Sequence, residues 1–278
     1  MNSMKLYDFD GMFEEKLADY IKRNPRGYTE KQWEDVIPAM YAKFGDTVVR
    51  SIGKTPNQFY AEQSDEELVA SLRAHLKKGV PVSEYLCSAI EGRDMEHLLI
   101  PLLSGSEDET AYALNLIGAS KSALPEYMRL LISSESEDVR NTCVDYVKEF
   151  ADDVKEEALK YYRSGVRSEY MLEILSRCKA RDEDIFEILL AAFRTADDGV
   201  LALRASYLAA YGDERALPYL TDRIEDEAIS YADFQDLKFA IEALGGTYEK
   251  ERDFSSDPYY DLIKSHGAID IDIFKDIK

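Results

Sequence analysis

Apolar residues recur along the middle of the chain with a period of 31 residues. Three series of apolar positions follow this spacing: Ala123, Val154, Ile185 and Ala216; Leu131, Tyr162, Phe193 and Ile224; Val147, Cys178, Ala209 and Ala240. Pro125 and Pro218, each within an Ala-Leu-Pro sequence, lie three periods apart. Self-similarity at a fixed spacing of this length is typical of proteins built from repeated supersecondary units.

Within each period, the apolar residues recur at helical spacing in two segments separated by short acidic or glycine-containing turns. Each repeat is therefore predicted to be a pair of helices. We expect the first helices near residues 94–104, 122–133, 153–164, 183–195 and 214–226. We expect the second helices near residues 107–118, 137–151, 167–179, 199–211 and 231–244.

The composition favours an all-α fold, because helix-forming residues dominate and the long β-branched runs of a sheet core are missing. A single helix pair has an apolar face that it cannot bury alone, so neighbouring pairs must stack. The sequence therefore predicts an α-α superhelix, a solenoid of about five helix pairs over residues 93–247.

Two stretches carry a family resemblance. One is Asp138-Val139-Arg140, which opens an expected second helix, and the other is the sequence Tyr211-Gly212-Asp213-Glu214-Arg215-Ala216-Leu217-Pro218. They resemble the HEAT repeats, particularly the short HEAT-like repeats named for phycobilisome lyases, in which the second stretch would be the hinge into the next first helix. The repeat from Asp153 to Cys178 departs from this pattern, since it lacks the Gly-Asp hinge and the proline. The resemblance implies a HEAT-like solenoid with a binding surface, and it does not specify an activity.

The two ends of the chain lack the period. Residues 1–92 are predicted to form a helical N-terminal cap, with capping boxes that begin at Thr29 and Ser64 and a helix start at Thr55-Pro56. Residues 248–278 are predicted to form a loop and a capping tail. In this tail Ile269, Ile271 and Ile273 alternate with aspartates, as in a strand or a docked extended segment.

The net charge of −21 is unevenly distributed, because residues 1–90 contribute −2 and residues 91–278 contribute −19. Nucleic acid binding requires clustered Lys and Arg, so this charge argues against a nucleic acid partner. It would attract a protein or peptide with a basic surface, although acidic helix faces also serve solubility alone.

The cysteines Cys87, Cys143 and Cys178 lie far apart and are expected to be buried apolar residues rather than a disulfide framework. No apolar run is long enough to cross a membrane, and no signal peptide precedes Asp10, so we expect a cytoplasmic protein without a membrane partner. With three separated histidines and acidic trios at 182–184 and 225–227 that do not fit a calcium loop, no metal site and no cofactor is predicted.

Two short matches to catalytic motifs fail on their context. Asp8-Phe9-Asp10-Gly11 is similar to the first motif of haloacid-dehalogenase-type phosphatases, but no buried strand precedes it, so a helix cap is expected there. Gly53-Lys54-Thr55 resembles the end of a phosphate-binding loop, but Val48 stands where that loop needs its first glycine. No catalytic residue is predicted.

The 19 tyrosines are well above ordinary usage, and several fall on the expected second helices, which line the concave side of such solenoids. Tyrosine offers a large contact area with a polar tip. The residues that we predict to bind a partner in this groove are Tyr112, Arg140, Tyr170, Arg177, Tyr207 and Asp236.

The function predicted from these features is a non-enzymatic protein–protein interaction scaffold that binds a protein or peptide in the concave groove. The alternative is an enzyme, or an accessory of one, of the HEAT-like lyase or glycosylase type with its site in the groove. A third possibility is self-association, in which the N-terminal cap or the Ile269–Ile273 tail docks on another copy of the chain.

Overall fold

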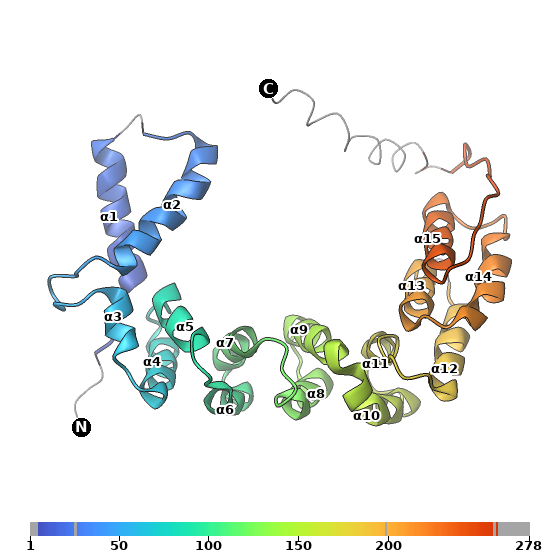
Figure 1. Ribbon diagram of the computed structural model, residues 1–278, viewed down its shortest axis with the longest axis horizontal. Coiled ribbons are helices and arrows are strands. Elements are labelled where there is room, and N and C mark those ends of the chain that lie inside the picture. The colour runs from blue at the N-terminus through green and yellow to red at the C-terminus, as the bar shows by residue number, and fades with distance from the viewer. Residues whose placement is uncertain (1–4, 25–26, 198, 258–259, 261–278) are drawn as a thin grey trace. The chain divides into compact units, whose positions relative to one another are not determined.

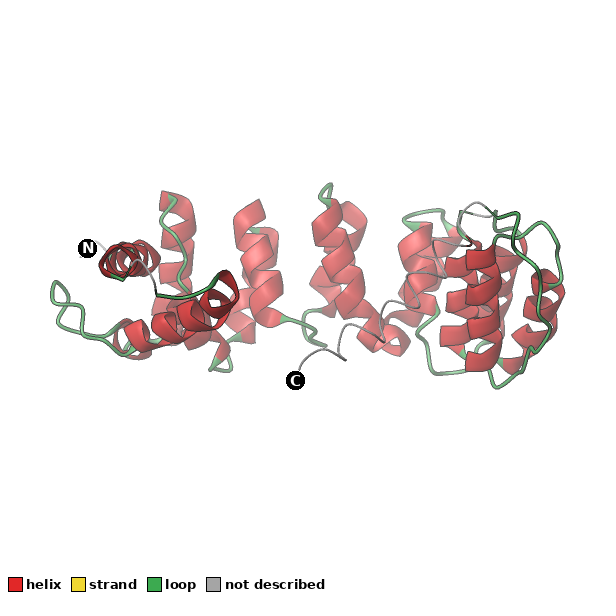
Figure 2. Ribbon diagram, turned by 90° about the horizontal axis from the view of Figure 1, so that it is seen from above, coloured by secondary structure: helices red, strands yellow, loops and turns green. Residues whose placement is uncertain are grey.

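In the computed structural model, the chain folds into helices wherever its described residues form regular structure (Figures 1 and 2). The structure describes residues 5–24, 27–197, 199–257 and 260, and within these ranges it contains no β-strand. The all-α prediction is thus confirmed. The chain divides into two compact units, residues 1–126 and 127–278, with the boundary in the first turn of α8 (Leu124–Ser133).

The first unit contains seven α-helices before α8. They are α1 (Phe9–Arg23), α2 (Glu30–Gly45), α3 (Pro56–Ala61), α4 (Asp65–Lys78), α5 (Glu84–Glu91), α6 (Glu96–Leu99) and α7 (Glu107–Ile117), with the 3-10 turn η1 (Ile100–Ser104) between the last two. The predicted capping boxes at Thr29 and Ser64 are confirmed, and Thr55 caps α3 with Pro56 in its first turn. Asp8 is the expected helix cap, because its carboxylate accepts a 2.7 Å hydrogen bond from the amide of Gly11.

An aromatic cluster forms the core at the start of the first unit. Phe9 is fully buried, and its ring lies edge-on to Tyr60 at 5.7 Å and to Tyr85 at 6.3 Å between centroids. The Tyr85 ring stacks on Tyr41 at 4.5 Å. Further along this unit, α4 packs against α6, and both α4 and α5 pack against α7. The aromatic rings join α1, α2, α3 and α5, since edge-to-face contacts add to the burial of apolar area.

The second unit continues with paired helices. After α8 come α9 (Glu137–Val147), η2 (Lys148–Phe150), α10 (Ala151–Arg163), α11 (Ser168–Leu175), α12 (Glu183–Arg194), α13 (Leu201–Tyr211), η3 (Glu214–Ala216), α14 (Leu217–Ile224) and α15 (Tyr231–Ala243). The pairs α10–α11, α12–α13 and α14–α15 pack together, and α11 contacts both α9 and α13. Adjacent helices therefore cover one another's apolar faces.

The predicted helix positions within residues 94–244 are confirmed, and each helix begins within two residues of its predicted start, except α14, which begins three residues late after the 3-10 turn η3. Two predicted ends are wrong. Helix α11 ends at Leu175 rather than near 179, because the Asp152 carboxylate accepts hydrogen bonds of 3.1 Å from the amides of Lys179 and Ala180 and holds them outside the helix. Helix α9 ends at Val147 rather than near 151, and the 3-10 turn η2 connects it to α10.

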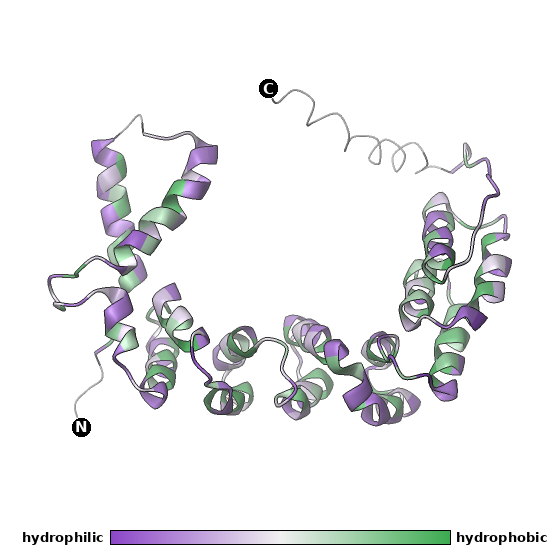
Figure 3. Cartoon of the chain, in the orientation of Figure 1, coloured by the Kyte–Doolittle hydropathy of each residue, from purple (hydrophilic) through white to green (hydrophobic). Residues whose placement is uncertain are grey.

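Helix α12 illustrates how the repeats bury their apolar stripe. Its residues Ile185, Phe186, Leu189, Leu190 and Phe193 are all buried, at the spacing that places them on one face. Burying each side chain contributes about 1.5–3 kcal/mol. Figure 3 shows the same division into hydrophobic and hydrophilic sides along the helices of both units.

The segment that follows α15 packs back on the last helix pair. Tyr248 and Phe254 are buried, and the Arg252 guanidinium donates hydrogen bonds to the carbonyl oxygens of Ile224 and Asp226 at 2.6 and 2.7 Å. The first of these contacts satisfies the carbonyl group of Ile224 at the end of α14, and the second fixes the turn that follows. The alternating Ile269–Ile273 run, predicted as a strand or docked tail, lies outside the described residues.

Candidate functional site

The six residues predicted to bind a partner are divided between the two units. Tyr112 lies on α7 in the first unit, where it is half-buried and burial raises the pKa of its phenol. The other five, Arg140, Tyr170, Arg177, Tyr207 and Asp236, lie in the second unit. The groove prediction therefore rests, within one unit, on these five side chains.

Arg140 and Tyr170 are brought together by the structure, but their polar groups serve the framework. The Arg140 Nη1 atom donates to the carbonyl oxygen of Ser134 at 2.8 Å, and its Nε atom lies 3.5 Å from the Tyr170 hydroxyl. That hydroxyl donates in turn to Oδ1 of Asn141 at 3.1 Å. These hydrogen bonds join the start of α9 to the start of α11, one repeat further along the chain.

Tyr207 is a core residue with 8% exposure, and burial raises its pKa to about 12. The Arg204 guanidinium lies 5.5 Å from the centre of its ring. Tyr207 occupies the turn of α13 at which the neighbouring second helices place apolar residues, such as Cys143 and Ile174. Its side chain therefore contributes to packing within the unit.

Arg177 and Asp236 are exposed, and no described contact joins them to the other predicted residues. Arg177 lines a shallow cleft of about 400 Å³ with Lys148, Asp152 and Lys179. Asp236 lies on α15, where desolvation and then the nearby Asp233 carboxylate raise its pKa. These two charged side chains are open to solvent, unlike the three discussed above.

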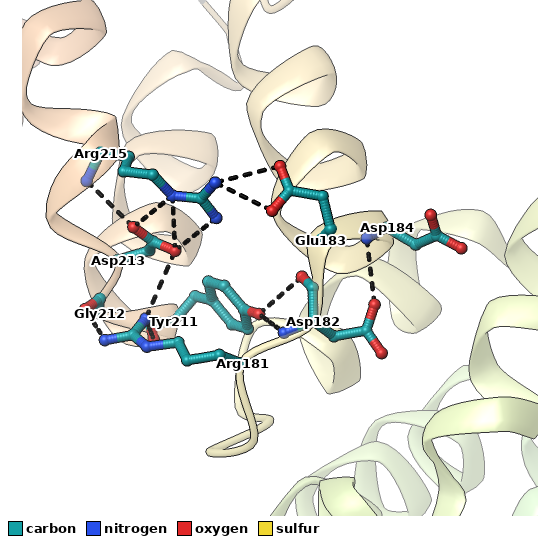
Figure 4. Close-up of polar contacts among 8 residues, drawn as sticks. All are labelled: Arg181, Asp182, Glu183, Asp184, Tyr211, Gly212, Asp213 and Arg215. Carbon is teal, nitrogen blue, oxygen red and sulfur yellow. Dashed lines mark hydrogen bonds and ion pairs between the residues drawn. The ribbon is translucent and has the colours of Figure 1, made fainter.

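The hinge sequence after α13 forms a polar network with the start of α12 (Figure 4). The Tyr211 hydroxyl accepts from the Asp182 amide at 2.8 Å and donates to the Asp182 carbonyl oxygen at 3.0 Å. Arg181 donates to the carbonyl oxygens of Tyr211 and Gly212, and Gly212 has a left-handed φ of 74°. Such hydrogen bonds satisfy backbone groups at helix ends. The polar residues of the hinge therefore have a structural role, and ligand binding is not needed to account for them.

The same network continues through a buried carboxylate. Asp213 accepts hydrogen bonds from the amide of Arg215 at 3.0 Å and from its guanidinium, which hold the pKa of Asp213 below its usual range. The Arg215 guanidinium also binds Glu183 at 2.9 Å and lies 4.1 Å from the centre of the Phe186 ring. Arg215 thus connects the α13–α14 turn to α12.

A different surface, which the sequence analysis did not single out, is an apolar cleft between α1 and α2. Its volume is about 410 Å³. It is lined by Phe13, Lys16, Leu17, Tyr20, Tyr28, Val36, Met40, Lys43, Phe44 and Thr47. Among these residues the charged side chains are both lysines, and the apolar part of the lining exceeds the polar part.

The cleft is closed at one end, where the two helices touch. There the Phe13 ring lies 5.0 Å from Tyr41 and 5.9 Å from Phe44, and the Tyr41 hydroxyl donates to Oδ1 of Asp10 at 2.5 Å. Away from this end α1 and α2 diverge (Figure 1). Ile21 on α1 is 44% exposed and Ile37 on α2 is also exposed, so each helix leaves an apolar side chain uncovered outside the lining of the cleft.

Sequence patterns did contain a signal for this cleft. The stripes Phe13, Leu17, Tyr20 and Trp33, Val36, Met40 have helical spacing, and such stripes are usually buried against a neighbouring element. Here Phe13, Leu17 and Tyr20 line the open cleft together with Val36 and Met40, whereas Trp33 lies outside the lining with its ring 5.0 Å from Tyr28.

Groups that could perform chemistry are dispersed in the part of the chain that the structure describes. No three His, Cys, Asp or Glu side chains gather there as metal ligands would. Burial raises the pKa of Cys87, Cys143 and Cys178 to about 12 in each case, so their thiols stay protonated at neutral pH. Cys143 and Cys178 are buried as predicted, whereas Cys87 is half-buried.

No helix within the described ranges has the length and apolar character needed to cross a membrane. In comparisons with known proteins, no family model, no curated protein and no solved structure matched this chain.

Proposed function

We propose that the chain is a non-enzymatic protein–protein interaction scaffold, and that the cleft between α1 and α2 receives an amphipathic helix of a partner protein. The observation that carries this proposal is an open apolar cleft whose lining has lysines as its charged groups. An amphipathic helix that lays its apolar face into a hydrophobic groove is a common mode of protein recognition. Here the partner helix would supply the third apolar face that α1 and α2 lack.

The exposed apolar residues support this assignment. Ile21, Tyr28 and Ile37 are large and exposed on or beside the two helices. Exposed apolar patches on a folded protein are typical of sites that bind another macromolecule, because water covers them at a free-energy cost. Covering the cleft would remove Tyr28 from water together with Val36 and Met40, which line it.

The local charge specifies the partner further. The chain as a whole has a net charge of −21 and would attract a basic surface, but this cleft has the opposite local charge. Lys16 and Lys43 come from α1 and α2, and Lys16 Nζ lies 4.6 Å from the centre of the Phe44 ring. We therefore expect acidic residues beside the apolar face of the partner helix.

We further propose that the helix pairs belong to the HEAT-like class and stack as a solenoid. The support is the 31-residue period, the paired helices and the contacts from each second helix to the next in the second unit. On this proposal the exposed side of the second helices is a second binding surface. Asp236 and Phe239, which is 73% exposed, lie on α15, and Arg177 follows the end of α11.

The proposal can be tested by selecting binders from a library of random peptides displayed on phage, with the full-length protein as the target. We expect the selected sequences to have apolar residues at helical spacing with acidic residues beside them. They should bind Val36→Glu at least about tenfold more weakly than the wild type, because that carboxylate lies in the apolar lining. Lys16→Glu should weaken the same peptides.

The matched control is Val48→Glu, since Val48 is an exposed valine of the same unit that does not line the cleft. It should bind the selected peptides as the wild type does. Peptides that are basic, that lack helical spacing, or that bind Val36→Glu and the wild type equally would overturn the proposal.

A further inference from the structure

A second cleft, in the second unit, has a different chemistry. It lies between the α10–α11 turn and the pair α12–α13, and its volume is about 470 Å³. Its charged lining residues are Arg163, Glu169 and Arg204, and its apolar walls include Leu172, Ala192 and Val200. The site therefore combines a small apolar space with a concentrated set of charges.

Arg204 is the unusual residue of this cleft, because it is a guanidinium with 6% exposure. Its Nη2 atom forms an ion pair with the Glu169 carboxylate. Its Nη1 atom is buried and has no hydrogen-bond partner among the described residues. A buried donor without an acceptor is unfavourable, so the planar head of Arg204 is only half satisfied.

Glu169, which forms the ion pair with Arg204, is exposed and makes a single contact with the guanidinium. The Glu169 side chain is 66% exposed, and it engages one of the two terminal nitrogens. A guanidinium matches a carboxylate best when two parallel N–H groups bind the two oxygens. Glu169 can move into solvent without leaving a buried charge behind, provided that another anion takes its place on Arg204.

Two helices begin at this cleft without a side-chain cap. Ser168 and Glu169 are the first residues of α11, and Val200 is the N-cap of α13. The other second helices of this unit, α9 and α15, are capped by Ser136 and Ser230. Uncapped first-turn amides and the helix dipole both favour an anion at these positions.

We infer that this cleft binds a carboxylate, which displaces Glu169 and forms two parallel hydrogen bonds with Nη1 and Nη2 of Arg204. The first turns of α11 and α13 contribute further attraction to the anion. This site is separate from the α1–α2 cleft, so the inference goes beyond the function proposed above.

The walls indicate what accompanies the carboxylate. Leu172, Ala192, Ala196 and Val200 provide an apolar surface beside Arg204. A carboxylate attached to a small apolar group suits this space, as at the end of a peptide chain that finishes in leucine. A glutamate side chain carries the same chemistry without the branched apolar group.

The acidic surroundings do not prevent anion binding. Asp184 is neutralised by its ion pair with Arg163, and the Asp197 carboxylate accepts from the amide of Gly199. More distant acids are screened at physiological ionic strength, where the Debye length is about 8 Å. Displacing Glu169 leaves the Arg204 guanidinium free for the ligand, while Arg163 stays paired with Asp184.

The test is a nuclear magnetic resonance titration of the full-length protein labelled with ¹⁵N-arginine at physiological salt. The probes are N-acetyl-leucine, its uncharged amide, and the α-amide of N-acetyl-glutamate. We expect a saturable shift of the Arg204 Nε resonance with a carboxylate probe and none with N-acetyl-leucinamide. Saturation by the leucine probe alone identifies a chain-end site, and saturation by both carboxylates identifies a general one.

Glu169→Gln is the decisive variant, because it removes the internal competitor and does not delete Arg204. The Glu169→Gln variant should have a several-fold higher affinity for the carboxylate probe than the wild type. The matched control is Glu173→Gln, one turn further along α11, where Glu173 pairs with Lys148 outside this cleft. The affinity of Glu173→Gln should equal that of the wild type. Arg204→Leu has no Nε resonance to follow, so its binding is measured by calorimetry beside the wild type, and it should bind neither carboxylate.

The inference is overturned if neither carboxylate saturates a shift at Arg204, or if the amide binds as well as the acid. It is also overturned if Glu169→Gln and the wild type have the same affinity. A carboxylate that binds Arg204→Leu as tightly as the wild type would place the anion elsewhere and would likewise reject the site.

Discussion

The pairs α1–α2 and α12–α13 are both amphipathic, but they differ in what covers their apolar sides. Helix α12 buries five large apolar residues against its neighbours, whereas α1 buries Phe9 and Phe13 and α2 buries Phe44 with Gly45. The remaining apolar residues of α1 and α2 line an open cleft. A helical stripe of apolar residues thus identifies a face that can be buried, and the neighbouring elements decide whether it is.

The polar contacts differ in the same way. In the second unit, charged side chains connect successive repeats, as in the ion pairs of Lys148 with Glu173 at 2.8 Å and of Lys155 with Asp182 at 2.8 Å. Between α1 and α2 the described side-chain hydrogen bond is that of Tyr41 with Asp10, at the closed end. The second unit is therefore held at many points, and the first helix pair is held at its base.

The largest expected effect is a loss of stability when an apolar side chain is shortened on the buried face of α12, compared with the same kind of change in the open cleft. Phe193→Ala should lower the free energy of unfolding of the second unit by about 3–5 kcal/mol, because this ring is buried on α12. Val36→Ala, in the open cleft, should cost less than about 1 kcal/mol, since its side chain is already partly in water. Urea denaturation measures both. Equal losses would mean that α1–α2 is packed as tightly as α12–α13.

A second change addresses the internal stability of α2. Pro38 lies inside this helix, where it removes a backbone hydrogen bond, and alanine is favoured over proline by about 3 kcal/mol in a helix interior. Pro38→Ala should slow hydrogen exchange of the amides in α2 and leave those of α12 unchanged. Unchanged exchange in α2 would show that neighbouring elements, rather than the helix itself, limit its opening.

A third prediction concerns acid stability in the second unit. Asp213→Asn should cost about 1–3 kcal/mol at neutral pH, because it removes charged hydrogen bonds from Arg215. The folded pKa of Asp213 is lowered, so its stabilisation is fully present above the unfolded pKa of about 3.9 and is lost as the pH falls through the folded value. The difference between wild type and variant should therefore shrink below about pH 4. A difference that grows in acid would contradict this assignment.

The smallest expected effects concern a glycine that ends a helix in each unit. Gly212 and Gly79 both have left-handed φ values, 74° after α13 and 63° after α4, and a Cβ at either would meet nothing closer than 4.0 Å. Replacing either by Ala should cost about 1–2 kcal/mol from backbone strain alone. Thermal unfolding of the two variants beside the wild type measures both losses of stability. A much larger loss at Gly212 would show that the polar network around Tyr211 tightens this turn.

Sequence periodicity predicted the helices because capping residues and apolar spacing are local properties. Exposure was less predictable. Tyr207 and Tyr170 both fall on second helices, yet one is buried in the core and the other reaches a neighbouring repeat. Tyrosine has an apolar ring and a polar tip, so its position on a helix does not determine which of the two directs its packing.

Both clefts escaped prediction for the same physical reason. The α1–α2 cleft is made of residues whose spacing is typical of a core, and only the arrangement of neighbouring elements leaves them open. Arg204 interrupts the apolar stripe of α13, and its burial depends on the α10–α11 turn one repeat earlier. Which residues come together to form each cleft can be seen only in the tertiary structure.

The hydrogen bonds between repeats also bear on how the second unit folds. Arg140 reaches Tyr170 and Arg181 reaches Tyr211, in each case 30 residues further along the chain. Contacts between residues that are close in sequence give a low contact order, and closing short loops costs little chain entropy. Folding of the second unit can therefore begin at one helix pair and spread to the next, and we expect it to be fast for its size.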